Sequence, residues 1–419
     1  MLEEYFNDTL VLSSIRRSIL QKSLENFAQY LMRRGHTHRM MKEYLRVAVH
    51  FVYWLENEGN LLPMAEDEIA QRFYHEHLPV CCCPVSTAYR ARIRAGLKHL
   101  LYVLRNDGHV LPVSEKSKMP IDIKIEEFEG HLKSVCGASA STCRQYTRYA
   151  HDFLRALYGD GQIDFSILTV KDIVKFVTER AKHYTPGTET AKAITTSVRS
   201  FLRYMVFQGL CNARLVNAVP TIPNWKLAGL PKSLNEQQRA SLLGAFDQST
   251  SVGRRDHAIA LCLIGLGLRC NEVAALCLDE IDWRKGVLRI HHGKGQRVNL
   301  LPLSADIGRA IAQYIRHDRP STQQRNIFVR HRPPIGESIK SCTVQAIIRR
   351  SFKRSGITTT FMGSHMLRHT AASRMVQAGV SIKEVADILG HRSINTTCIY
   401  AKVDLPTLSL VAMPWPEVQ

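Results

Sequence analysis

The stretch HMLRHTAASRMVQAGVSIKEVADILGHRSINTTCIYAK, residues 365–402, decides how the second half of the chain is interpreted. Residues three apart share one face of a helix, and Gly390 is typical of a helix C-cap. The stretch therefore predicts either a packed helix pair with polar side chains on its surface or a single active site. The side chains that would form such a site lie within 36 positions: His365, Arg368, His391 and Tyr400.

Three further polar residues upstream extend this set. We expect an otherwise apolar helix to end at Arg269, with Glu272 three residues later on the same face. Lys294 lies between two glycines, and the residues on both sides of this turn alternate between apolar and polar, which predicts a β-hairpin. The other segments of this half have helical periodicity, so it is predicted to be α-rich with a small sheet.

Each of these residues, taken singly, has a structural explanation that is more common than a catalytic one. Together they form a set of hydrogen-bond donors with one nucleophile. Such a set fits phosphoryl transfer without a metal ion, because guanidinium groups can hold the non-bridging oxygens while acids and bases move protons. A phenol, whose usual pKa is about 10, needs such neighbours to attack.

The size and charge of the chain favour a multidomain protein that binds nucleic acid. A length of 419 residues predicts two or three domains. Fifty-six basic and 37 acidic residues give a formal net charge of +19. A polyanionic partner such as DNA would relieve the repulsion within so basic a fold, although a merely basic surface is the alternative.

The sequence shows no secretion signal and no membrane span. Its N-terminus, MLEEYFNDTL, is acidic where a signal peptide would be basic. The longest apolar run has eleven residues from Ala258, and a span needs about 20. Eleven cysteines without a disulfide framework predict an intracellular, reduced protein.

One cluster of histidines and cysteines could suggest zinc. The stretch HEHLPVCCC, residues 75–83, offers five such side chains. Adjacent cysteines rarely converge on one ion, however, and no second pair at a customary spacing lies nearby. We therefore interpret the cysteines as buried or loop thiols and expect neither a metal site nor a cofactor. The five side chains are those of His75, His77, Cys81, Cys82 and Cys83.

The first two hundred residues contain a weak internal repeat with an offset of 101 or 102 residues. Each copy has the apolar periodicity of several amphipathic helices. After it, residues 215–232 contain three prolines and one glycine and are predicted to be a linker. The matching positions are Phe27 with Phe128, Gly35 with Gly137, Tyr44 with Tyr146, Phe51 with Phe153, and Gly108 with Gly209.

Basic side chains occupy other faces of the predicted helices in both copies. Two helical bundles with basic faces suit a protein that lies along a duplex, since each neutralised phosphate adds salt-dependent affinity. Solvated helix faces also carry Lys and Arg, so for any single residue both explanations stay open. The candidate DNA-binding residues in this half are Arg39, Lys42, Arg46, Arg144, Arg148 and Arg199.

Residues 233–402 resemble the tyrosine recombinases, the phage-integrase family of site-specific DNA recombinases. GLGLRCNEVAAL resembles the first arginine box, HHGKGQRVNLLPL the hairpin with the catalytic lysine, HMLRH the HxLRH box, and LGHRSINTTCIY the box that ends in the nucleophile. Where the family often has further basic residues, this chain has Arg297 and Asn299, and Arg297 joins the candidate DNA-binding residues. The resemblance implies six catalytic residues and a supporting acid: Arg269, Lys294, His365, Arg368, His391 and Tyr400, with Glu272.

This resemblance also implies the fold and its division. The fold would be mainly α with a small β-sheet, in which tandem helical SAM-like domains precede an α-rich catalytic domain of the DNA breaking–rejoining type. Residues 1–115 would duplicate the core-binding domain at 120–214. The linker at 215–232 would lead to the catalytic domain at 233–402, and the tail at 403–419 would dock in trans on a neighbour or fold back on its own domain.

The implied activity is site-specific DNA recombination for a mobile element. Tyr400 would attack the phosphate and form a 3′-phosphotyrosyl bond, with His365 as acceptor of its proton and Lys294 as donor to the 5′-oxygen. Arg269, Arg368 and His391 would hold the non-bridging oxygens. The partners would be duplex DNA and three further protomers, or related recombinases, that resolve a Holliday junction in the bacterial cytoplasm, at the nucleoid. The alternatives are a type IB topoisomerase, a hairpin telomere resolvase, or a non-catalytic DNA-binding regulator.

Overall fold

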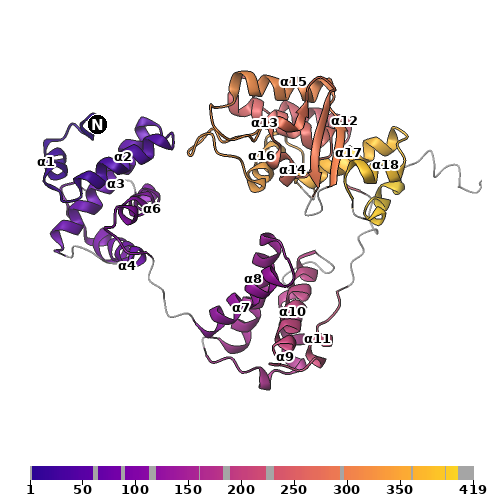
Figure 1. Cartoon of the computed structure of the whole chain (residues 1–419), viewed down its shortest axis with the longest axis horizontal. Helices are drawn as coiled ribbons and strands as arrows, with labels where there is room; N and C mark the ends of the chain where they lie inside the picture. The colour runs from indigo at the N-terminus through magenta and orange to yellow at the C-terminus, as the bar shows by residue number, and fades with distance from the viewer. Residues whose placement is uncertain are drawn as a thin grey trace, which may run out of the picture. The chain divides into compact units, whose positions relative to one another are not determined.

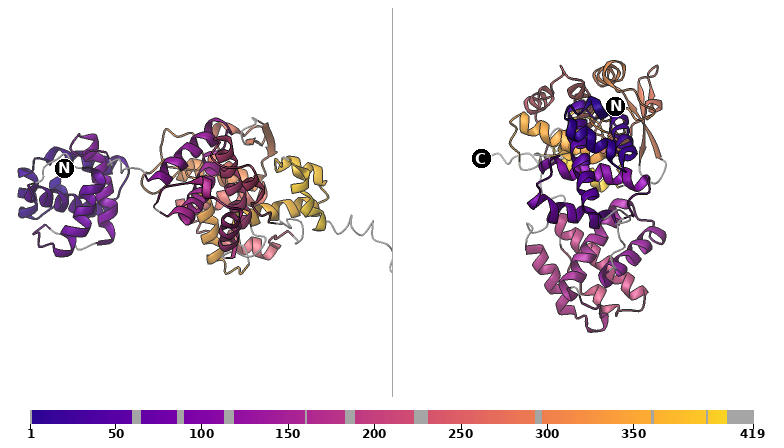
Figure 2. Two further views of the ribbon diagram at one scale, coloured as in Figure 1. Left: turned by 90° about the horizontal axis from the view of Figure 1, so that it is seen from below. Right: turned by 90° about the vertical axis from the view of Figure 1, so that its left-hand side faces the viewer.

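The computed structural model of the chain describes residues 2–59, 65–85, 90–112, 119–159, 161–182, 189–222, 231–292, 297–359, 362–391 and 393–403. Figures 1 and 2 show that these residues form helices and one small sheet. Three parts of the chain each have a hydrophobic core of their own. The predicted fold class, mainly α with a small sheet, is confirmed. None of the helices in the described ranges has the length and apolarity that crossing a membrane requires.

The first part, within residues 2–112, is a helical bundle. Its core is rich in aromatic side chains, among them Phe27, Phe51 and Phe73, which are fully buried, and Trp54. The longest helix, α3, packs against both α2 and α6. Its helices are α1 (Thr9–Arg17), α2 (Gln21–Arg33), α3 (His38–Asn57), α4 (Glu66–Arg72), α5 (Leu78–Val80) and α6 (Arg90–Asn106), with a 3₁₀ turn η1 (Leu2–Glu4) and a π-helical turn η2 (Phe73–His77).

The second part, within residues 119–222, is a separate compact helical unit. Leu215 and Val219, which we expected in a linker, are buried in its core, so the unit extends beyond the predicted boundary at residue 214. Its elements are α7 (Pro120–Ser134), α8 (Ala140–Tyr158), η3 (Phe165–Ile167), α9 (Val170–Lys182), α10 (Glu189–Phe207) and α11 (Arg214–Asn217).

The repeat predicted from the sequence has a structural counterpart in these two parts. Helices α2, α3 and α6 occur in the same order as α7, α8 and α10 (Figure 1). The N-cap hydroxyls of Thr37 on α3 and Ser139 on α8 each accept a hydrogen bond from the backbone N–H three residues later. Phe27 and its counterpart Phe128 are both fully buried, as are Phe51 and Phe153. Matching positions of the two copies therefore share the same burial and the same kind of helix cap.

The third part, within residues 231–403, combines helices with a three-stranded antiparallel sheet in the order β1-β2-β3. The predicted hairpin is confirmed, because β2 pairs with β3 from Val287 opposite Pro302 to His292 opposite Arg297. The elements are α12 (Glu236–Gly244), α13 (Ser251–Gly265), α14 (Cys270–Ala275), η4 (Leu278–Glu280), β1 (Ile281–Asp282), β2 (Val287–His292), β3 (Arg297–Pro302), α15 (Ala305–Gln313), η6 (Tyr314–Asp318), α16 (Ser341–Arg354), α17 (Ser364–Gln377), α18 (Ile382–Ile388), η7 (Ile394–Thr396) and η8 (Cys398–Val403).

The expectation that an apolar helix ends at Arg269 is wrong. Helix α13 ends at Gly265, and Arg269 instead precedes the first residue of α14. Gly267 causes this break, because its backbone has a φ of +65°, which side chains with a Cβ rarely adopt. A Cβ at Gly267 would also lie 2.6 Å from Leu389 Cδ2. The sharp turn at residues 266–269 therefore brings Arg269 and the end of α18 together.

Candidate active site

Arg269 is held by Glu272 at the start of α14. Arg269 Nη1 lies 2.8 Å from Glu272 Oε1, and the backbone N–H of Arg269 donates to Oε2 at 2.7 Å. Its Nη2 also lies 3.4 Å from the carbonyl oxygen of Gly390. Glu272 is largely buried, whereas the Arg269 side chain is 37% exposed. The expected pairing of this arginine with this acid is present, and the rest of the guanidinium is left accessible.

The buried side chain of Arg368 connects three segments of the chain through hydrogen bonds. It lies on α17 and is only 6% exposed. Its Nη1 donates to the Gly267 carbonyl and its Nη2 to the Leu389 carbonyl, each at 2.6 Å. Burial, and then the positive charge of Arg269, lower the pKa of Arg368 to about 10, which still leaves it protonated at neutral pH. The guanidinium thus fixes the turn before α14 and the end of α18 around a buried positive charge.

His391 follows the predicted C-cap at Gly390, which is confirmed by a φ of +61°. The backbone N–H of His391 closes α18 by donating to the Ala386 carbonyl at 2.9 Å. Its Nδ1 lies 2.6 Å from Thr397 Oγ1. Burial, with Arg368 and Arg269 nearby, lowers the pKa of His391 to about 4, so this imidazole is neutral at physiological pH.

Tyr400 is buried and bound to a histidine that the sequence reasoning did not single out. Its hydroxyl lies 2.7 Å from His369 Nδ1, and the phenol is only 2% exposed. Burial raises the pKa of Tyr400 to about 12, although the Arg368 charge acts in the opposite direction. His369 stands four residues after His365 in HMLRH, so helical spacing places both imidazoles on one face. That spacing was the available signal.

His365 lies at the mouth of a small pocket. The pocket is lined by Arg269, Asn271, Gln345, Ser364, His365 and Arg368, together with apolar atoms of the turn. Desolvation, and then the charges of Arg368 and Arg269, lower the pKa of His365 below its ordinary value. Its side chain is nevertheless exposed. The pocket therefore has guanidinium donors and a neutral imidazole around a space that an anionic group could enter.

The side chains of two predicted site residues lie outside the part of the chain that the structure describes. Lys294, the expected proton donor, lies outside the described residues, between β2 and β3 in the sequence. Arg297 begins β3, but its side chain also falls outside the described part. Asn299, further along β3, donates from Nδ2 to the Asp387 carbonyl of α18 at 2.6 Å. The hairpin is therefore anchored to the helix that precedes His391.

The candidate DNA-binding residues of the two helical parts differ in their surroundings. Arg39 and Arg46 are exposed on one face of α3 with the half-buried Lys42, and Arg39 pairs with Glu43 at 3.5 Å. Arg144 and Arg148 are exposed on α8.

Arg199 has a structural role that the sequence did not reveal. Its Nη2 donates to the Val219 carbonyl at 2.9 Å and is near that of Pro220 at 3.4 Å. The Arg199 guanidinium therefore holds the segment after α11, and fewer of its N–H groups are left for phosphate.

No set of carboxylates suited to a divalent cation stands among the described residues of this site. Its one nearby acid, Glu272, is already bound to Arg269, and the group of side chains in the described ranges with metal-ligand geometry lies in the first part of the chain. The cluster of guanidinium and imidazole groups around a phenol offers hydrogen-bond donors of the kind that bind phosphate oxygens.

Comparison with known proteins agrees with this chemistry. Residues 232–405 match the Phage integrase family, and residues 125–209 match the phage integrase N-terminal SAM-like domain. A protein of Sinorhizobium fredii named "Putative integrase/recombinase y4rA" is 35% identical over 394 residues, which cover 93% of each chain. The tyrosine recombinase XerA of Pyrococcus furiosus is 32% identical over 282 residues, 67% of this chain and 89% of that protein.

The fold also resembles a solved recombinase. The structure of XerH site-specific recombinase bound to a palindromic difH substrate superimposes with a TM-score of 0.53 at 19% identity, over 72% of this chain and 90% of that one. Fold, motifs and the near full-length relative all lead to the same assignment: the chain belongs to the phage integrase family of tyrosine recombinases.

Proposed function

We propose that this recombinase cuts and rejoins duplex DNA at specific sites through a 3′-phosphotyrosyl bond to Tyr400. The observation that carries the proposal is the position of the phenol. Its hydroxyl contacts His369 Nδ1 at 2.7 Å. His369 follows Arg368, which lines one pocket with Arg269 and His365. In the proposed step the Tyr400 oxygen bonds to phosphorus, the bond to the 5′-oxygen breaks, and the energy of that bond is kept in the phosphotyrosine.

The two arginines would bind the non-bridging oxygens. A guanidinium has five N–H donors, and Arg368 uses one on each of Nη1 and Nη2 for backbone carbonyls. The remaining N–H groups are held in place by those bonds and need no reorganisation when charge develops on the phosphate. Arg269, oriented by Glu272 and open to the pocket, would supply the second set of donors. His391, neutral and bound to Thr397, would add a further N–H.

Proton transfer would involve His365, His369 and Lys294. The lowered pKa of His365 and of His369 keeps both imidazoles neutral and able to accept the Tyr400 proton. His369 holds the phenol in the conformation described above, and His365, at the pocket, would accept the proton when Tyr400 reaches the phosphate. Lys294 would donate a proton to the departing 5′-oxygen.

Exchange of both strands would need four protomers, two DNA sites and a Holliday junction, and would serve a mobile element. The two helical parts would bind DNA through their basic faces, which the net charge of +19 favours. The tail, of which residues 404–419 lie outside the described part, is proposed to dock on the neighbouring protomer. Truncation after Lys402 would then leave binding to a single site unchanged but prevent pairing of two sites.

The nucleophile is tested by Tyr400→Phe, which removes one oxygen. The variant should bind its site but form no SDS-resistant protein–DNA adduct on a nicked substrate, in which the cleaved product is trapped. Tyr314→Phe is a matched control, because Tyr314 is also buried and its hydroxyl also contacts a histidine, His331 at 3.2 Å. An adduct formed by Tyr400→Phe, or its loss in Tyr314→Phe at normal folding, would contradict the assignment.

A further inference from the structure

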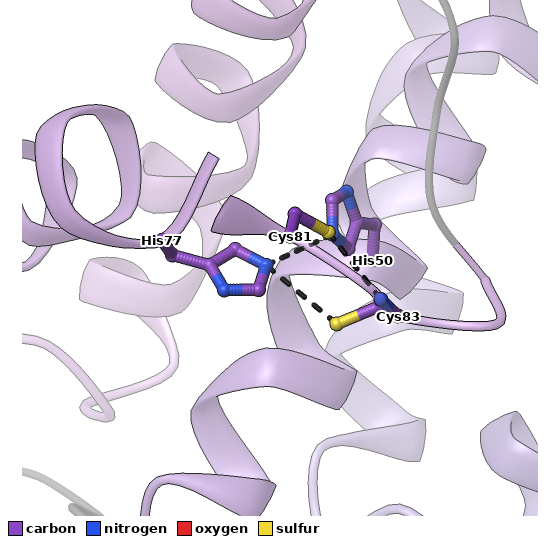
Figure 3. A group of neighbouring side chains, drawn as sticks. All are labelled: His50, His77, Cys81 and Cys83. Carbon is purple, nitrogen blue, oxygen red and sulfur yellow. Dashed lines mark hydrogen bonds between the residues drawn. The ribbon is translucent and has the colours of Figure 1, made fainter. Parts of the chain in front are cut away.

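Four side chains with metal-ligand atoms meet in the first part of the chain, far in sequence from the recombinase motifs. His50 comes from α3, His77 ends the π-helical turn η2, and Cys81 and Cys83 follow α5. One atom of each lies within 4.8 Å of one atom of every other. Figure 3 shows the two imidazoles and the two thiols turned toward a common centre.

The separations between these atoms suit one tetrahedral zinc ion. His50 Nε2 lies 3.1 Å from His77 Nε2 and 3.1 Å from Cys81 Sγ, and Cys83 Sγ lies 3.6 Å from His77 Nε2. With zinc bonds of about 2.0 Å to nitrogen and about 2.3 Å to sulfur, a tetrahedron separates two nitrogens by about 3.3 Å and nitrogen from sulfur by about 3.5 Å. Each measured separation is within about half an ångström of these values.

Hydrogen bonds among the four side chains would not satisfy all of their facing nitrogen and sulfur atoms. His50 is 1% exposed, and its Nε2 faces both another imidazole nitrogen and a thiol. A neutral imidazole carries one N–H, so one Nε2–H could serve at most one of the two neighbours well. A cation at the centre would instead be bound by the lone pairs of both nitrogens and both sulfurs.

Two features of the surroundings suit a bound cation. The backbone N–H of Cys83 points at Cys81 Sγ at 3.5 Å, a contact that would stabilise negative charge on that sulfur. Phe73 and Trp54 pack on the His77 ring and shield this side of the group.

We propose that His50, His77, Cys81 and Cys83 form a structural zinc site in the N-terminal helical part. Four protein ligands leave no open position, which is typical of structural and not of catalytic zinc. The ion would connect residues 77–83 to α3. Nineteen residues, Glu58 to Glu76, separate this segment from the end of α3 in the sequence. The ion would thereby fix the segment that precedes α6, the helix that packs most extensively on α3.

Sequence spacing alone did not reveal this site because its first ligand is distant. His50 stands 27 residues before His77, and within HEHLPVCCC only three of the five candidate side chains belong to the group. His75 and Cys82 do not. These two neighbours of the same residue types provide matched controls in the same segment.

The test uses the full-length protein, expressed and purified with no added metal and no histidine tag. Zinc is measured per folded chain by plasma mass spectrometry, after gel filtration and circular dichroism have shown that each variant is folded. The wild type should carry about one zinc per chain. Cys83→Ser and His77→Asn should lose it, whereas Cys82→Ser and His75→Asn should retain it. Cys83→His, which restores a ligand, should retain zinc in part.

Cobalt gives a readout that does not depend on stability. Apoprotein made with a chelator and refilled with Co²⁺ should show the intense visible bands of tetrahedral cobalt and a sulfur-to-metal charge-transfer band. The Cys83→Ser variant should lose the charge-transfer intensity of one thiolate. Metal-free wild-type protein that fails to bind either ion, a Cys81–Cys83 disulfide in its place, or equal zinc loss in both members of a matched pair would overturn the proposal.

Discussion

Replacing Arg368 with lysine separates the structural use of this residue from its proposed use on the phosphate. Arg368 donates two hydrogen bonds of 2.6 Å, to the carbonyls of Gly267 and Leu389, from a buried position on α17. Lysine keeps the positive charge but has a single nitrogen at the end of a flexible stem, so it cannot reach both carbonyls and the phosphate as a planar fork does.

The loss in stability can be estimated from these two bonds. A hydrogen bond from a charged group contributes about 1.5–3 kcal/mol, and the ammonium can remake one of the two. The expected destabilisation is therefore about 1.5–3 kcal/mol. For a unit of this size about 2–4 °C accompany each kcal/mol, so the unfolding temperature of the catalytic part should fall by about 3–12 °C. A lost donor to the transition state should also slow cleavage by about 10²–10³-fold.

The assay compares cleavage of a nicked substrate by folded protein, well below the unfolding temperature, with thermal unfolding of the same preparation. Arg374→Lys is the matched control, because Arg374 lies on the same helix, is 45% exposed and pairs with Glu236 at 3.1 Å. The control should change neither quantity measurably. Arg368→Lys with normal stability would refute the account of the two carbonyl bonds, and normal cleavage by the folded variant would refute the phosphate role.

Three other predictions concern the proton donor, pH and the first helical part. Lys294→Ala should slow cleavage by about 10²–10⁴-fold. A substrate with sulfur in place of the bridging 5′-oxygen should restore the rate of cleavage, because a thiolate leaves without a proton. Equal defects on both substrates would exclude Lys294 as the proton donor. In the folded protein the pKa of His391 is lowered from 6.5 to about 4. The unfolded chain therefore binds more protons in this range, and stability should fall as the pH drops from 6.5 toward 4. If the unfolding midpoint of His391→Asn depends on pH with the same slope as that of the wild type, this prediction is contradicted. Deletion of residues 1–115 should weaken DNA binding and reduce the slope of log affinity against log salt, whereas an unchanged slope would assign that part to protein contacts.

Local sequence signals predicted the elements whose structure depends on nearby residues. The alternation around residues 293–295 gave the β2–β3 hairpin, and Gly390 marked the end of α18. The ion pair between Arg269 and Glu272 followed from their spacing. The repeat was visible because equivalent core positions, such as Phe27 and Phe128, must both be buried in the same kind of bundle. In each case the deciding interactions lie within one element or one repeat.

The features that were missed depend on contacts between distant segments. At Gly267, where the chain turns after α13, a Cβ would meet Leu389 more than a hundred residues later, so the close approach of these two segments was not visible locally. His369 acquires its contact from Tyr400, 31 residues away, and His50 approaches His77, Cys81 and Cys83 from another helix. Periodicity places a residue on a face of its own helix, but it carries no information about the segment that will pack there.

The buried position of Tyr400 has a consequence for when the recombinase can act. An attacking oxygen must come to about 3–3.5 Å from its target, yet the phenol is 2% exposed and packs among Ala372, Val376, Val385 and Leu389. On the mechanism proposed above, the phenol must therefore leave this position before it can attack a DNA phosphate. It is held there by its hydrogen bond to His369 and by its apolar contacts.

The energy of this restraint can be set against that of DNA binding. The hydrogen bond contributes about 0.5–1.5 kcal/mol and the buried ring about 1.5–3 kcal/mol, so release costs roughly 2–4.5 kcal/mol. At about 1.4 kcal/mol per tenfold, roughly 1 in 30 to 1 in 2,000 free chains would have an exposed phenol. A phosphate bound by Arg269 and Arg368 would form several charge-assisted hydrogen bonds, but it shifts this equilibrium only by the difference in its affinity for the two positions of the phenol. On the proposed mechanism, bound DNA must therefore favour the exposed phenol by roughly the same 2–4.5 kcal/mol.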